Sequence, residues 1–176
     1  MNSIPLQMAT NRPGFMAMAS RQLMHLIDLM GRIPHSFIAL LARFSLAMTF
    51  WLSGQTKIEG LVLDPVGLNV QWGMPHISAS AIELFRSEYA LPIVPPELAA
   101  HLAATAEHVL PVLLLIGLAS RLSALALLMM TLVIQVFVYP DAFPTHGLWA
   151  AVMLYVMARG PGAVSLDHLI ARRARR

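Results

Sequence analysis

The sequence contains no cysteine and few charged residues. Only 12% of the 176 residues are Asp, Glu, Lys or Arg, against about 25% in an ordinary globular protein. Without cysteine, the chain itself forms no disulfide, no CxxC redox pair and no thiolate metal site. It also lacks the HExxH, GxGxxG, GK[ST] and GxSxG patterns, so no familiar hydrolase or nucleotide site is indicated.

The residues that are present are mostly apolar. Hydrophobic residues make up 57% of the chain, and the mean hydropathy is +0.67. This composition predicts an integral membrane protein whose first partner is the lipid bilayer. The formal charge is +3, but the arginines cluster beside apolar segments, which fits membrane topology better than nucleic-acid binding.

Four apolar runs predict four membrane-spanning helices, each of about 20 residues. The expected spans are residues 35–53, 97–118, 122–139 and 143–158. Pro34 precedes the first span, Pro95 and Pro96 precede the second, and Pro144 opens the fourth, in keeping with proline's preference for helix starts. The predicted fold is all-α, with residues 35–159 forming one four-helix membrane bundle.

Residues 1–34 are predicted to form an amphipathic N-terminal segment. Between Met16 and Arg32, polar side chains recur at helical spacing on one face, opposite an apolar face: Arg21, His25, Asp28 and Arg32. We therefore expect a helix that lies in the lipid headgroup region. A soluble helix packed against the bundle is the alternative.

Basic residues flank the spans unevenly. Arginines precede the first span, occupy the second-to-third turn at Arg121, and fill the tail, residues 160–176, after the fourth span. Because short cytoplasmic flanks carry the excess of Lys and Arg, both chain ends are expected to be cytoplasmic.

The loop of residues 54–96 is too long for a simple connector. Ser80 and Glu83 have capping-box spacing, which predicts a short helix over Ala81–Tyr89. The loop is expected to form a lid over the external side of the bundle.

Glu107 and His108 are ionisable residues in the middle of the second span. A charge near the bilayer centre costs at least about 2.5 kcal/mol, so it must be paired, hydrated or used. Arg43 lies within the first span, and we predict an Arg43–Glu107 ion pair. His101 and His108 share one helix face, and Glu107 points about 100° away from His108.

Two interpretations of these polar residues stay open. In the structural one, the ion pair sets helix register, and His101 and His108 donate to backbone carbonyls. In the functional one, Glu107 accepts a proton or hydrogen bond from a bound headgroup, and His108 titrates beside it. Gln135 and His146 are expected to line the same cavity.

No metal site is expected, although four residues are weak candidates. His101 and His108 are about 10 Å apart along the helix axis, too far to chelate one ion. Ligands from several segments would have to converge, and the residues considered are Met74, His76, His101 and His146.

Three segments resemble the DoxX family of small four-span membrane proteins. They are RFSLAMTFWLSGQTKI (43–58), AEHVLPVLLLIGLASR (106–121) and GPGAVSLDHLI (160–170), within a resemblance that covers residues 39–170. The loop is similar to that of a long-loop subgroup. The residues that match the family's polar positions are Arg43, Lys57, Glu107 and Arg121.

The resemblance implies a helical bundle in the bacterial inner membrane. Members of this family are tied to quinone-linked oxidation of reduced sulfur compounds, to oxidative or thiol stress, or to small secreted metal-handling peptides. This chain departs from a self-contained redox enzyme because it has no cysteine, flavin motif or bis-histidine haem spacing. Whether it is an enzyme stays open, and no intrinsic cofactor is expected.

Three hypotheses remain. The chain is an accessory subunit of an oxidoreductase with a quinone pocket at Glu107 and His108, beside a membrane or periplasmic protein that supplies the redox centre. Alternatively, it is a carrier or export accessory for a small solute, lipid or metal-loaded peptide, or it is a structural membrane scaffold. A homo-oligomer is compatible with each.

Overall fold

The computed structural model describes residues 15–176, which belong to two units, residues 1–34 and 35–176. The first unit contains α1 (Phe15–Gly31), so the predicted N-terminal helix is confirmed within one residue at each end. The remainder of that predicted segment, residues 1–14, lies outside the described residues. Placement of α1 in the headgroup region stays a prediction.

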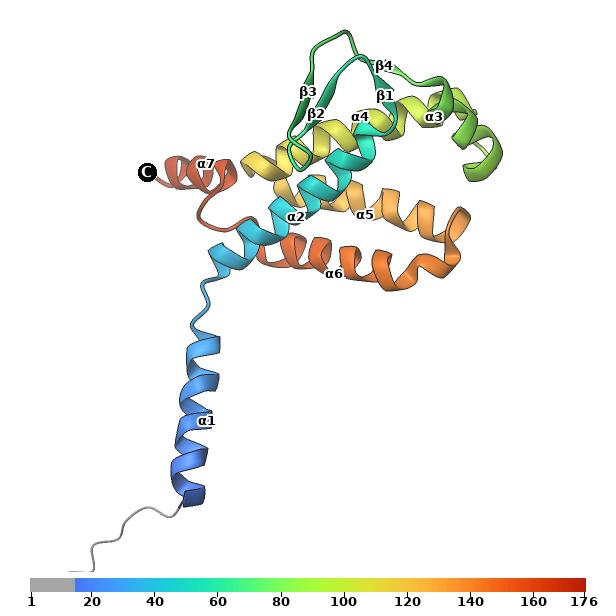
Figure 1. Ribbon diagram of the computed structural model, residues 1–176. Helices are drawn as coiled ribbons and strands as arrows, with labels where there is room; N and C mark the ends of the chain where they lie inside the picture. The colour runs from blue at the N-terminus through green and yellow to red at the C-terminus, as the bar shows by residue number, and fades with distance from the viewer. Residues whose placement is uncertain (1–14) are drawn as a thin grey trace, which may run out of the picture. The chain divides into compact units, whose positions relative to one another are not determined.

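Four long helices form the core of the second unit. They are α2 (His35–Gln55), α4 (Pro96–Ile116), α5 (Ser120–Phe137) and α6 (Phe143–Arg159). Each packs against two of the others, α2 against α4 and α6, and α5 against α4 and α6 (Figure 1). Their shared core includes Leu46, Phe50, Leu114, Leu127 and Met153. The predicted four-helix bundle is confirmed.

The outer faces of these helices are apolar. Exposed side chains such as Phe37, Leu122 and Leu148 suit hydrocarbon rather than water. Among the described residues, α2, α4 and α5 are long and apolar enough to cross a membrane. At 17 residues, α6 is shorter, so its assignment as the fourth span stays a prediction.

The helix boundaries differ from the predicted spans by one or two residues in α4. Pro96 occupies the first turn, where its missing N–H costs nothing. At the other end Gly117 adopts φ +73°, and the N–H of Leu118 donates back to the Leu113 carbonyl at 2.9 Å. This glycine-based cap ends the helix at Ile116 rather than at the predicted Leu118.

The long loop is structured. β1 (Ile58–Glu59) pairs with β4 (His76–Ile77), and β2 (Val62–Asp64) pairs with β3 (Asn69–Gln71), both antiparallel. Figure 1 shows these strands beside α2 and α4. The sequence did not predict them, because strands of two or three residues carry too little alternation to be recognised.

A short helix follows the strands, as predicted, but with a different cap. It consists of α3 (Ala79–Leu84) and the π-turn η1 (Phe85–Tyr89). The capping residue is Ser78, whose Oγ accepts a hydrogen bond from the Ala81 N–H at 3.1 Å. The predicted cap, Ser80, is already helical, so the helix begins two residues earlier than predicted.

The basic tail folds back onto the bundle. After the 3-10 turn η2 (Pro140–Ala142) and α6, Ser165 caps α7 (Leu166–Ala174) by accepting from the His168 N–H at 3.2 Å. The N–H of Asp167 donates to the Gly117 carbonyl at 2.8 Å. The start of α7 is therefore attached to the turn between α4 and α5 (Figure 1).

Candidate functional site

The end of α2 lies unusually close to the middle of α4, and Gly54 makes this possible. A Cβ atom on Gly54 would stand 2.8 Å from His108 Cε1 and 3.0 Å from Glu107 Cβ. Those distances leave no room for any side chain. Close approach through a small residue is common between membrane helices, and here it brings polar groups of α2 and α4 into contact.

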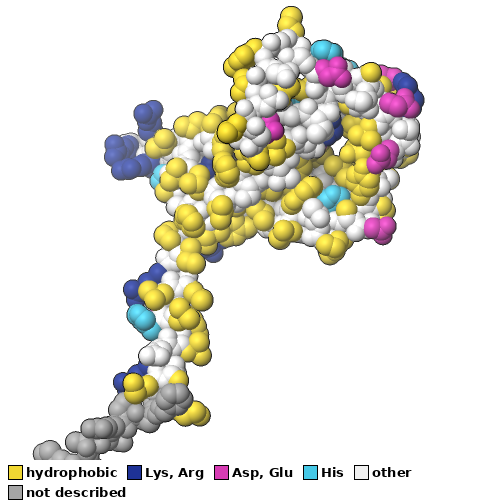
Figure 2. All heavy atoms as spheres, viewed as in Figure 1, with side chains coloured by type: hydrophobic (Ala, Val, Ile, Leu, Met, Phe, Trp, Pro, Cys, Tyr) yellow, Lys and Arg dark blue, Asp and Glu magenta, His cyan; other side chains and the backbone are white. Residues whose placement is uncertain are grey.

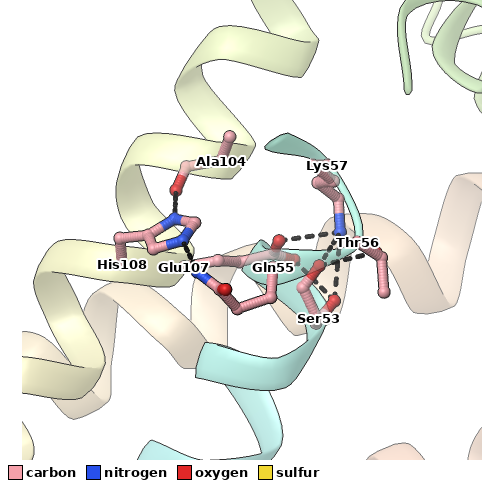
Figure 3. Close-up of polar contacts among 7 residues, drawn as sticks. All are labelled: Ser53, Gln55, Thr56, Lys57, Ala104, Glu107 and His108. Carbon is pink, nitrogen blue, oxygen red and sulfur yellow. Dashed lines mark hydrogen bonds and ion pairs between the residues drawn. The ribbon is translucent and has the colours of Figure 1, made fainter. Parts of the chain in front are cut away.

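Glu107 is paired with Lys57. The Nζ–Oε2 distance is 2.7 Å, and the two side chains are only 5% and 4% exposed. Lys57 Nζ also donates to the Ser53 hydroxyl at 3.0 Å and the Ser53 carbonyl at 3.2 Å. The Ser53 hydroxyl in turn donates to Glu107 Oε1 at 3.1 Å (Figure 3). We call Ser53, Lys57 and Glu107 the lysine–glutamate cluster.

The predicted Arg43–Glu107 pair is therefore wrong. Because α2 continues to Gln55, Lys57 lies just past the helix end, four residues after Ser53, and folds back over it. Arg43 is ten residues before Ser53, about 15 Å away along the helix. The sequence places Lys57 in the external loop, at a polar position of the family, but its inward turn was not predicted.

Arg43 instead binds the C-terminal end of α4. Its guanidinium donates to the carbonyls of Leu114 at 3.0 Å, Leu115 at 3.4 Å and Val164 at 2.5 Å. The last carbonyls of a helix lack partners within the helix and carry partial negative charge, so a buried cation suits them. Arg43 is 1% exposed and serves as a cap.

Asp167 performs the matching role for α5. Its Oδ1 accepts from the Ala119 N–H at 2.8 Å, and its Oδ2 accepts from the Ser120 N–H at 2.9 Å. These donors belong to the start of α5, where a carboxylate is favourable. We call Arg43 and Asp167 the α4–α5 clasp. The family-like positions Arg43 and GPGAVSLD thus converge on one helix turn.

His108 connects α4 to the loop. Its Nδ1 donates to the Ala104 carbonyl at 2.6 Å, so in the neutral ring Nε2 accepts from the Gln55 amide at 2.9 Å (Figure 3). Gln55 Oε1 accepts from the Leu63 N–H at 2.7 Å. His108 is therefore part of a hydrogen-bond chain that holds β2 to the end of α2.

Two further contacts complete this attachment and the histidine assignment. Trp51 Nε1 donates to the Leu63 carbonyl at 2.7 Å, so both backbone polar groups of Leu63 bind side chains of α2. His101 Nδ1 bonds the Glu97 carbonyl at 2.7 Å. Of the structural interpretation, the bonds of both histidines to backbone carbonyls are confirmed, whereas its Arg43–Glu107 pair is not.

Glu107 and His108 face different hollows, as their angular separation on α4 predicts. Glu107 and Lys57 line a cavity of about 300 Å³, which we call the Glu107 cavity, with walls from η1, α4 and α5 that include Phe85, Tyr89, Leu102, Ala103, Met130 and Ile134. His108 lines a larger groove of about 800 Å³ between α4 and the strands, which we call the hairpin groove, with Trp51, His76, His101 and Thr105.

The remaining predicted site residues lie elsewhere. His146 Nδ1 bonds Gln135 Oε1 at 2.8 Å, and neither residue lines the Glu107 cavity. Arg121 lines a third hollow at the end of the bundle near α7.

The weak metal candidates do not converge either. His76 and His101 line the hairpin groove, and His76 Nδ1 approaches the Met74 carbonyl, while His146 bonds Gln135. Within residues 15–176, no three His, Asp or Glu side chains gather as a metal site would require.

Tyr89 was missed in the sequence, because only the folding of η1 brings it to the Glu107 cavity. Burial and, second, the charge of Glu107 raise the pKa of Tyr89. Tyr139 packs edge-on against Tyr89 and donates to the Glu88 carboxylate, a hydrogen bond that raises the pKa of Tyr139. Ser53 was also missed, although its four-residue spacing to Lys57 is a signal that was available.

The three candidate spans, the apolar outer face and the buried ion pair define a multi-pass helical membrane protein. The DoxX family model matches residues 38–140, more than half of the chain. The chain belongs to the DoxX family. The matched region contains Arg43, Lys57, Glu107 and Arg121, and it ends before α7. No curated protein and no solved structure matches the chain.

Proposed function

We propose that this protein is an accessory subunit of a membrane redox or thiol-stress pathway and that the Glu107 cavity binds a quinol or quinone headgroup. The observation that carries the proposal is a buried carboxylate in the wall of an otherwise apolar cavity of about 300 Å³. Ligand pockets typically combine apolar walls with a few polar groups that orient the ligand.

The hydrogen bonding of the cluster favours a ligand that donates. An ammonium has three N–H donors, and those of Lys57 already face the Ser53 hydroxyl, the Ser53 carbonyl and Glu107. The carboxylate of Glu107 has about four acceptor positions, and two are used. A hydroxyl group of a quinol can therefore bind Glu107 without breaking an existing contact, whereas a quinone carbonyl cannot bind Lys57 so easily.

The chain contributes a binding site rather than a redox centre in this proposal. A protein partner at the membrane or in the periplasm supplies the electron acceptor, since the chain has no cysteine. Tyr89 and Phe85 pack around the bound ring. Glu107 holds one hydroxyl and is placed to receive its proton when the partner oxidises the ring.

We place the protein in the bacterial inner membrane with α6 as the fourth span and both chain ends cytoplasmic. Figure 2 supports this orientation for residues 35–176, since Lys and Arg gather at the α7 end and Asp and Glu at the other. The basic end then faces the cytoplasm. The Glu107 cavity, whose wall includes η1, then lies in the periplasmic half.

Binding of short-chain quinols to the full chain in quinone-free nanodiscs tests the proposal. Isothermal titration with a quinol, its quinone and its dimethyl ether should give the strongest binding for the quinol, by about tenfold. The paired variant Lys57→Met with Glu107→Gln removes both charges together and should abolish this preference. Ala103→Leu fills the cavity and should abolish binding of all three ligands.

Glu97→Gln is the matched control, because Glu97 is an acid of the same helix that pairs with Arg86 outside the cavity. It should bind like the wild type. The proposal fails if a folded Lys57→Met, Glu107→Gln variant keeps the quinol preference, or if the dimethyl ether binds as tightly as the quinol.

The hairpin groove supports a second candidate, a carrier or export accessory. It is larger, at about 800 Å³, and His76, His101, Thr105 and His108 put polar atoms in its wall. If this groove handles a small solute, Thr105→Leu should change cellular sensitivity to that solute while respiration and quinol binding stay unchanged. If Thr105→Leu leaves solute sensitivity unchanged and Ala103→Leu leaves quinol binding unchanged, the hypothesis of a structural membrane scaffold is favoured.

A further inference from the structure

A third hollow lies at the end of the bundle where α6 ends and α7 begins. Its volume is about 410 Å³, and its wall combines the start of α2, Arg121 at the start of α5, and residues 159–163. The titratable groups in the wall are His35, Arg121, Arg159, Asp167 and His168. This hollow is separate from the Glu107 cavity, and no lining residue is shared.

The two arginines of this hollow have free guanidinium groups. Neither Arg121 nor Arg159 makes a hydrogen bond or an ion pair with any residue in the described range 15–176. By contrast, the guanidinium of Arg43 donates to backbone carbonyls, and that of Arg86 pairs with Glu83 and Glu97. Two unengaged guanidiniums that line one hollow are available for the charge-assisted hydrogen bonds with which arginine binds phosphate.

The single acid in the wall, Asp167, forms no ion pair with either arginine among the described residues. Both carboxylate oxygens of Asp167 are held by the N–H groups of Ala119 and Ser120, on the side of the α4–α5 turn. Gly160 has φ +82°, and a Cβ there would lie 3.3 Å from Arg121 Nη2. The glycine thus lets the Arg121 guanidinium lie over the α6–α7 backbone at the rim of the hollow.

Exposed apolar side chains are close in sequence to residues that line the hollow. Leu122, next to Arg121, is 70% exposed. The segment that leads into α7 and its outer face expose Val164, Leu166, Leu169 and Ile170, with Arg172 and Arg173 close behind in sequence. A basic hollow with such apolar neighbours in sequence suits a headgroup whose acyl chains run along the protein.

We propose that this hollow binds the phosphate of an anionic phospholipid, such as phosphatidylglycerol or cardiolipin. Arg121 and Arg159 clamp the phosphate, His35 and His168 lie beside it, and the acyl chains pack over Leu122. The site anchors the α6–α7 connection to one leaflet. This proposal does not depend on the ligand of the Glu107 cavity.

Lipid titration of the full chain in a neutral detergent tests the site. Native mass spectrometry with added phosphatidylglycerol or phosphatidylcholine should show preferential binding of the anionic lipid. Arg121→Gln with Arg159→Gln should weaken phosphatidylglycerol binding by about 30-fold, since each basic side chain near an anionic surface contributes about fivefold.

Arg172→Gln with Arg173→Gln is the matched control. It removes the same charge from α7 without changing the wall of the hollow, and it should weaken binding by less than about threefold. If the two double variants weaken phosphatidylglycerol binding equally, the lipid is attracted by the overall positive charge rather than by a defined site, and the proposal is overturned.

A further variant and a competition experiment complete the test. Ala163→Glu introduces a carboxylate into the hollow while both arginines remain, and it should abolish the preference even if the double arginine variant fails to fold. Inorganic phosphate should not compete with the lipid at equal concentration. If phosphate competes fully, the site recognises a free anion rather than a lipid, and the proposal is overturned.

Discussion

Two buried charges, Arg43 within α2 and Lys57 just past its last residue, are satisfied in opposite ways. In the region of the α4–α5 turn, Arg43 meets only backbone carbonyls. In the region where α2 ends, Lys57 meets a carboxylate that also lines a cavity. Both are almost completely excluded from solvent.

The difference separates architecture from function. Arg43 and Asp167 neutralise the facing ends of α4 and α5, and every polar atom that they contact belongs to the protein backbone. The lysine–glutamate cluster leaves acceptor capacity on Glu107, which lines a hollow. Burial of an ionisable group in a membrane protein is therefore not enough to mark a site, and an adjoining cavity with unused hydrogen-bonding capacity is the more useful criterion.

The largest effect is expected from Arg43→Met. It leaves the carbonyls at the end of α4 without their cation, and hydrogen bonds to charged groups contribute about 1.5–3 kcal/mol each. We expect a loss of about 4 kcal/mol in the free energy of unfolding, measured by SDS titration in mixed micelles. The folded fraction should bind quinol with unchanged affinity. A drop in that affinity would show that the Arg43 region and the lysine–glutamate cluster do not act separately.

Lys57→Met should destabilise the protein by about 3 kcal/mol, because it leaves Glu107 buried without its counter-ion. Adding Glu107→Gln should recover most of the loss, since no buried charge then remains. The same unfolding assay measures both variants. Failure of the second substitution to recover stability would show that the ion pair itself, rather than the avoided lone charge, stabilises the bundle.

Glycine substitutions compare the Arg43 region and the lysine–glutamate cluster directly. Gly117→Ala is strained by φ +73°, and its Cβ would meet Arg43 Nη1 at 2.4 Å, so we expect a loss of about 2 kcal/mol. Gly54→Ala has no backbone strain, but its Cβ would lie 2.8 Å from His108 Cε1 and 3.0 Å from Glu107 Cβ, so we expect a loss of about 2 kcal/mol from overpacking. Only Gly54→Ala should weaken quinol binding. If both variants weaken quinol binding equally, the Arg43 region and the lysine–glutamate cluster are coupled.

Gln55→Leu tests the attachment of β2 with a smaller effect. It removes the acceptor of the Leu63 N–H and the partner of His108, for a loss of about 1 kcal/mol. Hydrogen exchange should accelerate in residues 62–71 while α4 and α5 stay protected. Uniform acceleration across the bundle would mean that the strands are part of the core stability.

The smallest effect concerns tyrosine titration. The folded pKa of Tyr89 is raised by burial and by Glu107, so the unfolded chain ionises first. Stability should be constant below about pH 10, the ordinary tyrosine value, and should fall as the pH rises above it. An NMR titration of labelled tyrosine should give a lower pKa for Tyr89 in the Lys57→Met, Glu107→Gln variant than in the wild type. In Arg43→Met the pKa of Tyr89 should be unchanged.

Part of the site could be predicted. The depth of Glu107 in an apolar run and its angle to His108 follow from helical periodicity alone, and both hold in the structure. The ion pair was assigned to Arg43 because both residues lie inside apolar runs. That argument ignored a lysine just past a helix end, whose long side chain can reach back four residues.

The sequence alone determined that this is a four-helix membrane protein of the DoxX family, because apolar runs of sufficient length and a recognisable family pattern are local properties. Only the tertiary structure decided which charges meet. The pairing of Lys57 with Glu107, the convergence of Arg43 and Asp167 on one turn, and the strands held by Gln55 all join residues more distant than one helix repeat. Such contacts depend on where each helix stops and how closely glycine lets two helices approach, and neither quantity is encoded in the periodicity of a single segment.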